Sequence, residues 1–118
     1  MIKNHVVNEF EKSILTGITV GVGSLVLLFS SNVRVMIQCP FEFEVKEHLQ
    51  TGHGECPASS VIIFPALNQK VESCAMLNGE RLNFHFSNES NLQITPEKNG
   101  LESYVITTSY GDYPVVIF

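Results

Sequence analysis

The chain has 118 residues, of which 44% are hydrophobic, and this length and composition suit one folded domain with its own core. Seven Lys and Arg against twelve Asp and Glu give a net charge of −5, which disfavours binding to nucleic acid or to an anionic membrane and favours a basic protein partner. Two glutamates before the first apolar run argue against a secretory signal, and three cysteines indicate reduced thiols in a cytoplasmic protein, with one disulfide as the open alternative.

The first predicted element is a short N-terminal helix, because Val6, Val7, Phe10 and Ile14 are spaced as one apolar helical face. The uncharged stretch 13–33 that follows is long enough to raise the question of a membrane span. Three glycines, seven Thr, Ser or Asn residues and a period of two between apolar positions predict paired strands there instead.

Two hairpins are predicted in the first half of the chain. Gly23-Ser24 is a candidate type II′ turn, which would set Ile18 against Phe29. The loop 30–32 ends in Asn32, a residue that tolerates the left-handed conformation. Pairing across this loop aligns three apolar pairs: Phe29 with Val33, Leu27 with Val35, and Leu25 with Ile37.

The same pattern recurs at a fixed offset of 57 residues. The matching segments are Leu25-Val-Leu-Leu-Phe29-Ser30 with Leu82-Asn-Phe-His-Phe86-Ser87, and Val35-Met-Ile37 with Leu92-Gln-Ile94. Because the shared apolar positions are two residues apart, they indicate a duplicated β module.

Turn residues predict the pairing of strands in the second copy. Asn78-Gly79 is the preferred pair for a type I′ turn and would set Ser73 against Phe84. The loop 87–89 would set Phe84 against Leu92.

Two further strands are predicted in each half: 41–45 and 61–64 in the first, and 103–108 and 115–118 in the second. Gly111-Asp112 would close the last hairpin, and Pro114 predicts that the final strand lies at a sheet edge. We therefore predict a mainly β single domain of two similar modules, at about 14–64 and 67–118. Their antiparallel meanders would form a β-sandwich or a flattened barrel.

The predicted outer faces of the two modules differ in chemistry. The first carries Val26, Leu28 and Met36, and the second carries Asn83, His85, Asn91 and Gln93. We expect the N-terminal segment to cover the apolar outer face. The alternative is that this face is a patch that binds a partner.

Residues 46–60 are predicted as a long loop that only the first copy has, and long loops are often functional. This loop and its surroundings are acidic. The candidate partner-binding residues are Glu42, Glu44, Glu47, His48, His53 and Glu55, with Glu97, Glu102 and Asp112 as secondary candidates.

No pattern typical of an enzyme is present. The sequence has no glycine-rich phosphate loop, no strained serine elbow and no basic stripe with aromatics, so we expect no catalysis and no cofactor. His48, His53 and Cys56 could supply three metal ligands, but no fourth ligand is near in sequence, and we expect no metal.

Several of these segments resemble a known family. Leu82-x-Phe84-x-Phe86-Ser-Asn, Leu92-x-Ile94-x-Pro and Glu102-Ser-Tyr104-Val-Ile106 are similar to segments of small bacterial immunity proteins, including those of contact-dependent growth inhibition and other polymorphic toxin systems. The resemblance implies a non-catalytic cytoplasmic protein that binds and neutralises a cognate toxin domain.

Two functional hypotheses follow from the sequence. In the first, the acidic residues cover the active site, or an adjacent surface, of a basic toxin, most simply a nuclease. In the second, the chain is a β-sandwich module that binds a small ligand, a glycan or a peptide on the amide-rich face around Asn83, His85, Asn91 and Gln93.

Overall fold

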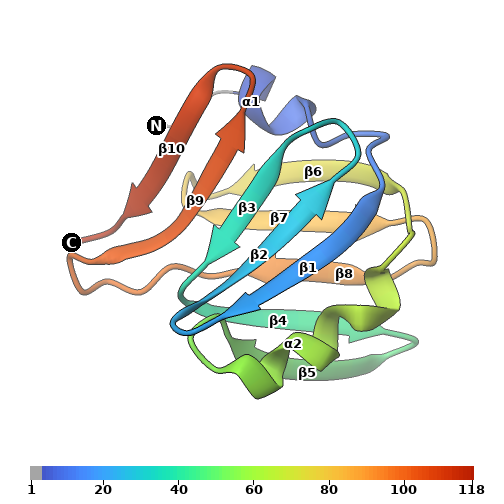
Figure 1. Cartoon of the computed structure of the whole chain (residues 1–118), viewed down its shortest axis with the longest axis horizontal. Helices are drawn as coiled ribbons and strands as arrows, with labels where there is room; N and C mark the ends of the chain where they lie inside the picture. Colours follow the sequence, from blue (N-terminus) through green and yellow to red (C-terminus); the bar gives the residue numbers. More distant parts are fainter. Residues whose placement is uncertain (1–3) are drawn as a thin grey trace.

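The structure, a computed structural model, describes residues 4–118 as two five-stranded antiparallel sheets packed face to face, so the predicted β-sandwich is confirmed (Figure 1). Sheet A has the order β1-β2-β3-β9-β10, and sheet B has the order β5-β4-β8-β7-β6. The strands are β1 (Leu15–Gly21), β2 (Ser24–Phe29), β3 (Arg34–Ile37), β4 (Pro40–Val45), β5 (His48–His53), β6 (Val71–Leu77), β7 (Arg81–Phe86), β8 (Asn91–Ile94), β9 (Glu102–Thr108) and β10 (Gly111–Val116). The helical elements are α1 (Asn4–Asn8), η1 (Pro57–Ser59), α2 (Ser60–Ile63) and η2 (Phe64–Ala66).

Neither sheet is built from one half of the chain. The meander β1-β2-β3 continues in sheet A into the hairpin β9-β10, and the meander β6-β7-β8 continues in sheet B into the hairpin β4-β5. The two junctions have equivalent registers, since Val35 pairs with Ile106 and Leu92 pairs with Phe43. The duplicated halves therefore exchange their last hairpins reciprocally.

The second loop of each meander has the predicted geometry. Asn32 has a φ of 64°, in the left-handed region, at the end of the first of these loops. The predicted pairings of Leu27 with Val35 and of Phe84 with Leu92 are confirmed. Because side chains alternate along a strand, these pairings bury one apolar face of each meander.

In the first hairpin, β1-β2, the pairing of the two strands is shifted by two residues from the predicted pairing. Gly21 pairs with Ser24, so the turn lies at Val22-Gly23 and Ile18 faces Leu27. A shift of two residues keeps Ile18 on its predicted face, but Val22 now lies in the turn and is fully exposed, and Val20 is 45% exposed.

In the first hairpin of the second half, β6-β7, the pairing of the strands differs from the prediction by one residue, and this shift changes which side chains are buried. Asn78 and Gly79 have positive φ as a type I′ turn requires, at 54° and 73°. Pairing then resumes one residue later than predicted, and Cys74 instead of Ser73 lies opposite Phe84. A shift of one residue turns side chains to the opposite face, so the Cys74 thiol is buried in the core.

The prediction of a long loop at 46–60 is wrong, because this region contains β5. The turn that joins β4 to β5 consists of Lys46 and Glu47, whose φ values are 50° and 63°. Lys and Glu rarely adopt this left-handed conformation, so the turn lacks the Asn-Gly signature of a two-residue hairpin. The hairpin β4-β5 is thus part of the shared scaffold.

The prediction of a strand at 61–64 is also wrong, since these residues belong to the helical segment that joins β5 to β6. Pro57 and Pro65 lie in the first positions of two helical turns, where a missing N–H costs nothing. The structural equivalent of β5 is β10, whose preceding turn lies at Ser109-Tyr110, upstream of the predicted Gly111-Asp112. β10 is an edge strand, as Pro114 predicts.

The predicted N-terminal helix is confirmed as α1, but it does not cover the outer face of sheet A. Val6 and Val7 are buried, and Phe10 packs edge to face on Phe29 and Phe84 with ring centroids 5.1 and 5.3 Å apart. Figure 1 shows α1 at one end of the sandwich. The N-terminal segment therefore completes the core between the two sheets.

The outer face of sheet A consequently faces solvent in the part of the chain that the structure describes. Val26, Leu28 and Met36 line an open groove on this face, and Leu28 is 37% exposed. Ile14, which was expected to help cover them, is itself 39% exposed. The expectation that the N-terminal segment covers this face is therefore wrong, and the alternative of a patch that binds a partner stays a prediction.

A tyrosine hydroxyl ties sheet A to the turn between β6 and β7. Tyr104 is fully buried, and its hydroxyl donates a 2.7 Å hydrogen bond to the backbone carbonyl oxygen of Glu80. Burial raises the pKa of Tyr104 above its ordinary value, so the hydroxyl keeps its proton and its role as donor. Phe41 has the equivalent place in the other half, since it pairs with Ile94 as Tyr104 pairs with Ile37.

Candidate functional site

The outer face of sheet B is polar and carries a pair of carboxylates. Phe41 and Phe43 of β4 point into the core, so Glu42 and Glu44 between and after them point outward. The same alternation applies to the neighbouring strands. The other residues on this face are Leu49, Thr51 and His53 of β5, Asn91 and Gln93 of β8, and Arg81, Asn83 and His85 of β7.

The exchange of hairpins brings together residues that the sequence assigned to two separate hypotheses. Glu42 pairs with Gln93, and Glu44 pairs with Asn91, so the carboxylates of the first half lie beside the amides of the second. A hollow of about 250 Å³ lies among these side chains. Its lining consists of Glu42, Glu44, Leu49, Asn83, Asn91 and Gln93. We call these six residues the acidic hollow.

A hydrogen bond orders the side chains next to the hollow. Nδ1 of His85 lies 2.9 Å from Oδ1 of Asn91, and because an amide oxygen only accepts, the His85 Nδ1 donates. In the neutral ring this leaves Nε2 as an acceptor. The Asn91 amide nitrogen then remains as a donor beside Glu44, so the hollow presents both fixed amide donors and carboxylate acceptors.

A second acidic group lies at the end of β5. Nε2 of His53 is 3.5 Å from a carboxylate oxygen of Glu97, and Nδ1 accepts a 3.1 Å hydrogen bond from the backbone N–H of Glu55. The Glu55 carboxylate is 3.9 Å from the same ring. These half-exposed contacts place the connection between β8 and β9 beside the end of β5, and they add little stability.

Seven of the nine residues predicted to bind a partner lie on sheet B or at its margin. Glu42 and Glu44 are on the outer face, Glu47 and His48 are at the turn before β5, and His53, Glu55 and Glu97 are at its other end. Glu102 and Asp112 are on the hairpin β9-β10 of sheet A, so they do not join this surface.

The three candidate metal ligands do not come together. His48 and His53 are at opposite ends of β5, about 16 Å apart at the strand rise per residue. Within residues 4–118, no group of three His, Cys, Asp or Glu side chains is placed to hold a metal ion.

The cysteines do not offer a nucleophile in the core. Burial, with a smaller effect from the charge of Glu97, raises the pKa of the Cys39 thiol from 9.0 to about 12. Burial likewise raises the pKa of Cys74. Both thiols remain protonated and therefore weakly reactive at neutral pH, while Cys56 is exposed. All three cysteines are free, so the disulfide alternative does not apply.

Sequence reasoning did not associate Leu49 and Arg81 with this face. Leu49 is 54% exposed beside Glu44, and Arg81 is half-buried on the outer side of β7. The pairing of β4 with β8 joins residues about 50 positions apart, and no local pattern in either strand indicates it. Because the sequence at Lys46-Glu47 does not indicate a turn, β5 is not predicted, and neither is the place of Leu49 on this face.

Among the described residues, 4–118, no helix is long and apolar enough to cross a membrane. Comparisons of the chain with protein-family models, with curated proteins and with solved structures give no match.

Proposed function

We propose that the chain is a non-catalytic protein that binds a basic protein partner through the acidic hollow of sheet B. The partner would be a toxin domain that the chain neutralises, as the resemblance to immunity proteins implies. The supporting observation is the carboxylate pair Glu42 and Glu44, set in a hollow whose lining contains no Lys or Arg. A nuclease toxin binds phosphates through a basic cleft, and the same positive field would attract this acidic surface.

The carboxylates are held on a rigid support. β4 is hydrogen-bonded to β5 on one side and to β8 on the other, so the backbone that carries Glu42 and Glu44 is fixed before any partner arrives. The two residues are about 6.6 Å apart along the strand, which suits contacts to two neighbouring cationic side chains. A prearranged surface loses little conformational entropy on binding, and more of the contact energy remains as affinity.

The charged margin extends the surface along β5. Glu47 and His48 lie at one end of this strand, and His53, Glu55 and Glu97 lie at the other. Charges at the rim of an interface act mainly on the rate of encounter, whereas Glu42 and Glu44 lie where an interface would exclude water. The proposal includes a cytoplasmic location, no cofactor, and no binding to nucleic acid or membrane.

The proposal is tested with the double variant Glu42→Lys/Glu44→Lys and the purified toxin domain that the proposal expects the neighbouring reading frame to encode. We expect the association rate at low salt to fall by at least 10-fold, because the variant replaces attraction by repulsion. For the unchanged chain, added salt should slow association, and this slowing should disappear in the double variant. Stopped-flow or surface plasmon resonance at two salt concentrations measures both effects.

Glu11→Lys/Glu102→Lys is the matched control, since it makes the same four-unit change of charge on two exposed residues outside sheet B. It should reduce the association rate much less than Glu42→Lys/Glu44→Lys. Equal rates for the unchanged chain and Glu42→Lys/Glu44→Lys would reject the acidic hollow as the binding site.

A second candidate function rests on the amides in the same hollow. Asn83, Asn91 and Gln93 can donate and accept hydrogen bonds in a space of about 250 Å³, which suits a small polar molecule such as a monosaccharide. A glycan array and a panel of sugars followed by NMR test this function. Chemical-shift changes at Asn83 and Gln93, abolished in Asn83→Ala, would favour it over the binding of a toxin.

A further inference from the structure

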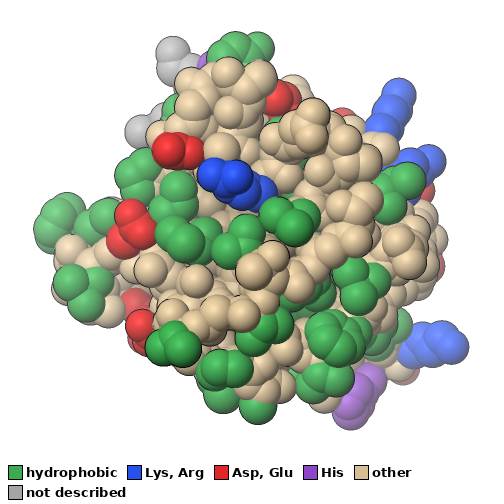
Figure 2. Space-filling view, in the orientation of Figure 1, with side chains coloured by type: hydrophobic (Ala, Val, Ile, Leu, Met, Phe, Trp, Pro, Cys, Tyr) green, Lys and Arg blue, Asp and Glu red, His purple; other side chains and the backbone are tan. Residues whose placement is uncertain are grey.

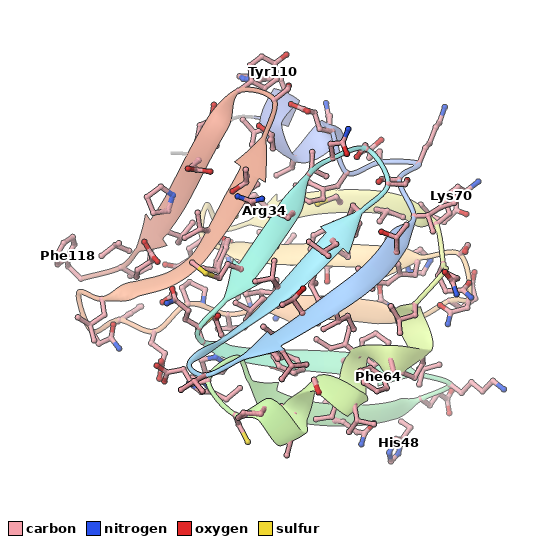
Figure 3. The ribbon with its side chains drawn as sticks, viewed as in Figure 1. Arg34, His48, Phe64, Lys70, Tyr110 and Phe118 are labelled. Carbon is pink, nitrogen blue, oxygen red and sulfur yellow. The ribbon has the colours of Figure 1, made fainter. Side chains whose placement is uncertain are left out.

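The outer face of sheet A has an apolar groove at the place equivalent to the acidic hollow. The groove measures about 440 Å³ and is open to solvent. It is lined by Thr19, Val26, Leu28, Arg34, Met36, Val105, Thr107 and Asp112. Figure 2 views this side and shows hydrophobic side chains gathered around a single Lys or Arg side chain, and Figure 3 labels Arg34 there on β3.

The face carries one cation and one anion in a single row across three strands. Arg34 of β3 pairs with Thr107 of β9, which pairs with Asp112 of β10. The Thr107 hydroxyl donates a 2.7 Å hydrogen bond to Oδ1 of Asp112 and fixes the position of this carboxylate. Arg34 is exposed and has no ion pair with any of the residues 4–118. Two strand spacings separate the backbones of Arg34 and Asp112 by about 10 Å.

We propose that this face binds a second copy of the chain in a two-fold symmetric dimer. A two-fold axis that lies between the copies, parallel to β9 and above Thr107, places Arg34 of one copy opposite Asp112 of the other. The dimer then contains two identical ion pairs, as an isologous interface requires. Because the axis follows a strand, the two sheets pack with their strands aligned, which is a common sheet-on-sheet arrangement.

The charges favour a second copy over other occupants. The row of Arg34 and Asp112 is neutral in total and complementary to itself, whereas an acidic or a basic partner would match only one of the two charges. An open groove cannot enclose a small molecule on most of its surface, as pockets for small ligands do. The apolar walls, Val26, Leu28, Met36 and Val105, would be removed from water by a matching apolar face.

The size of the face sets the expected strength of the dimer. Five strands at their usual spacing and rise give roughly 500 Å² per copy. This area is smaller than the roughly 800 Å² per partner of a standard stable interface, so we expect a dissociation constant of about 10–100 μM. The acidic hollows of both copies lie on the opposite sheets and stay exposed in such a dimer.

Sedimentation equilibrium from about 1 μM to about 1 mM, a range that spans the expected dissociation constant, tests the proposal directly. The unchanged chain should convert from monomer to dimer over this range. Arg34→Asp and Asp112→Arg should each weaken self-association by at least 10-fold, because each places like charges opposite one another. The double variant Arg34→Asp/Asp112→Arg restores opposite charges and should restore the dimer.

An equimolar mixture of the two single variants gives an independent result. The row carries two anions in the Arg34→Asp variant and two cations in the Asp112→Arg variant, so the mixture should form a mixed dimer that neither variant forms alone. Glu89→Arg, an exposed change in the loop between β7 and β8 of sheet B, is the matched control and should leave self-association unchanged. Circular dichroism and thermal unfolding verify that every variant is folded.

Three results would overturn the dimer. The first is that the unchanged chain stays monomeric up to about 1 mM, well above the expected dissociation constant. The second is that the single charge reversals leave the strength of the dimer unchanged. The third is that the double variant stays monomeric. Binding of an apolar dye to the groove of a monomeric chain would identify a small apolar molecule as the occupant and would also count against a second copy. None of these measurements requires the toxin, so the dimer and the proposed function can fail independently.

Discussion

The outer faces of the two sheets have the same architecture and opposite chemistry. Val26 and Met36 on sheet A have the same places in the repeat as Asn83 and Gln93 on sheet B. Both faces are shaped by the same strand order and register, and both are hollowed at the same place. One hollow is apolar with one arginine and one aspartate, and the other holds two carboxylates among amides. The duplication therefore conserves shape while leaving recognition free to differ between the two faces.

The inner faces show why only the outer faces could diverge. Leu25 and Leu27 in the first half, and Leu82 and Phe84 in the second, are all fully buried at equivalent positions. Each must fill space between two sheets about 10 Å apart, so only apolar groups of similar volume are tolerated there. An outward residue meets water or a partner, and a change there alters binding at little cost in stability.

The largest expected effect is the loss of stability on truncating equivalent core residues. Leu27→Ala should lower the free energy of unfolding by about 2–5 kcal/mol, and Phe84→Ala by about 3–5 kcal/mol, because each leaves a cavity in a buried layer. Urea denaturation followed by circular dichroism measures both. The matched outer-face variants Val26→Ala and Asn83→Ala should each cost less than about 1 kcal/mol. An outer variant as costly as its inner neighbour would break the distinction between shared core and free surface.

The sequence predicted the inner faces well, because their information is local. A period of two and the loop at 30–32 are enough to pair Leu27 with Val35, and nothing far away in the chain alters this pairing. At the displaced turn, Val22-Gly23, the error was two residues, so Ile18 keeps its predicted face although Val20 and Val22 are exposed. Local pattern also predicted correctly that β10 is an edge strand.

The candidate site was harder to predict, for two physical reasons. The turn at Lys46-Glu47 adopts a left-handed conformation in residues that seldom adopt it, so β5 was mistaken for a loop. The exchange of hairpins then pairs Glu42 with Gln93, a long-range contact that depends on how two whole modules dock. Consequently the acidic residues were recognised, but their neighbours and their shared face were not.

An intermediate effect is expected at alkaline pH, and it reports on the core beneath both faces. Burial raises the pKa of Cys39 from 9.0 to about 12 and also raises the pKa values of Cys74 and Tyr104. These groups bind their protons more tightly in the folded chain than in the unfolded chain. Their contribution to stability is therefore complete below pH 9 and is lost as the pH rises toward the folded-state pKa values. We expect the free energy of unfolding to be about 3 kcal/mol lower at pH 10 than at pH 8.

Denaturant titrations at half-unit steps between pH 8 and pH 11 would measure the slope of the free energy of unfolding against pH. The two thiols should titrate on unfolding within this range. Cys39→Ala should reduce the slope by about half, because Cys74 and Tyr104 still titrate on unfolding. Cys56→Ser removes an exposed thiol that is in contact with water in both states, and the slope should persist. A profile that is flat in the unchanged chain would contradict the role of the buried groups.

The smallest expected effect comes from the Tyr104 hydroxyl, which has no counterpart on Phe41 at the equivalent position of the other half. Tyr104→Phe removes the 2.7 Å hydrogen bond to the Glu80 carbonyl oxygen and should cost about 1 kcal/mol, measured by urea denaturation. The reciprocal change at the equivalent position, Phe41→Tyr, adds a hydroxyl to a ring end that already packs against Gly52. The Ser59 side chain fills the same space beside Gly52, so the added hydroxyl has no room and we expect a larger cost of about 2 kcal/mol. Equal costs for the two changes would mean that the halves share their polar anchoring as well as their shape, and the difference between them would then be confined to the outer faces.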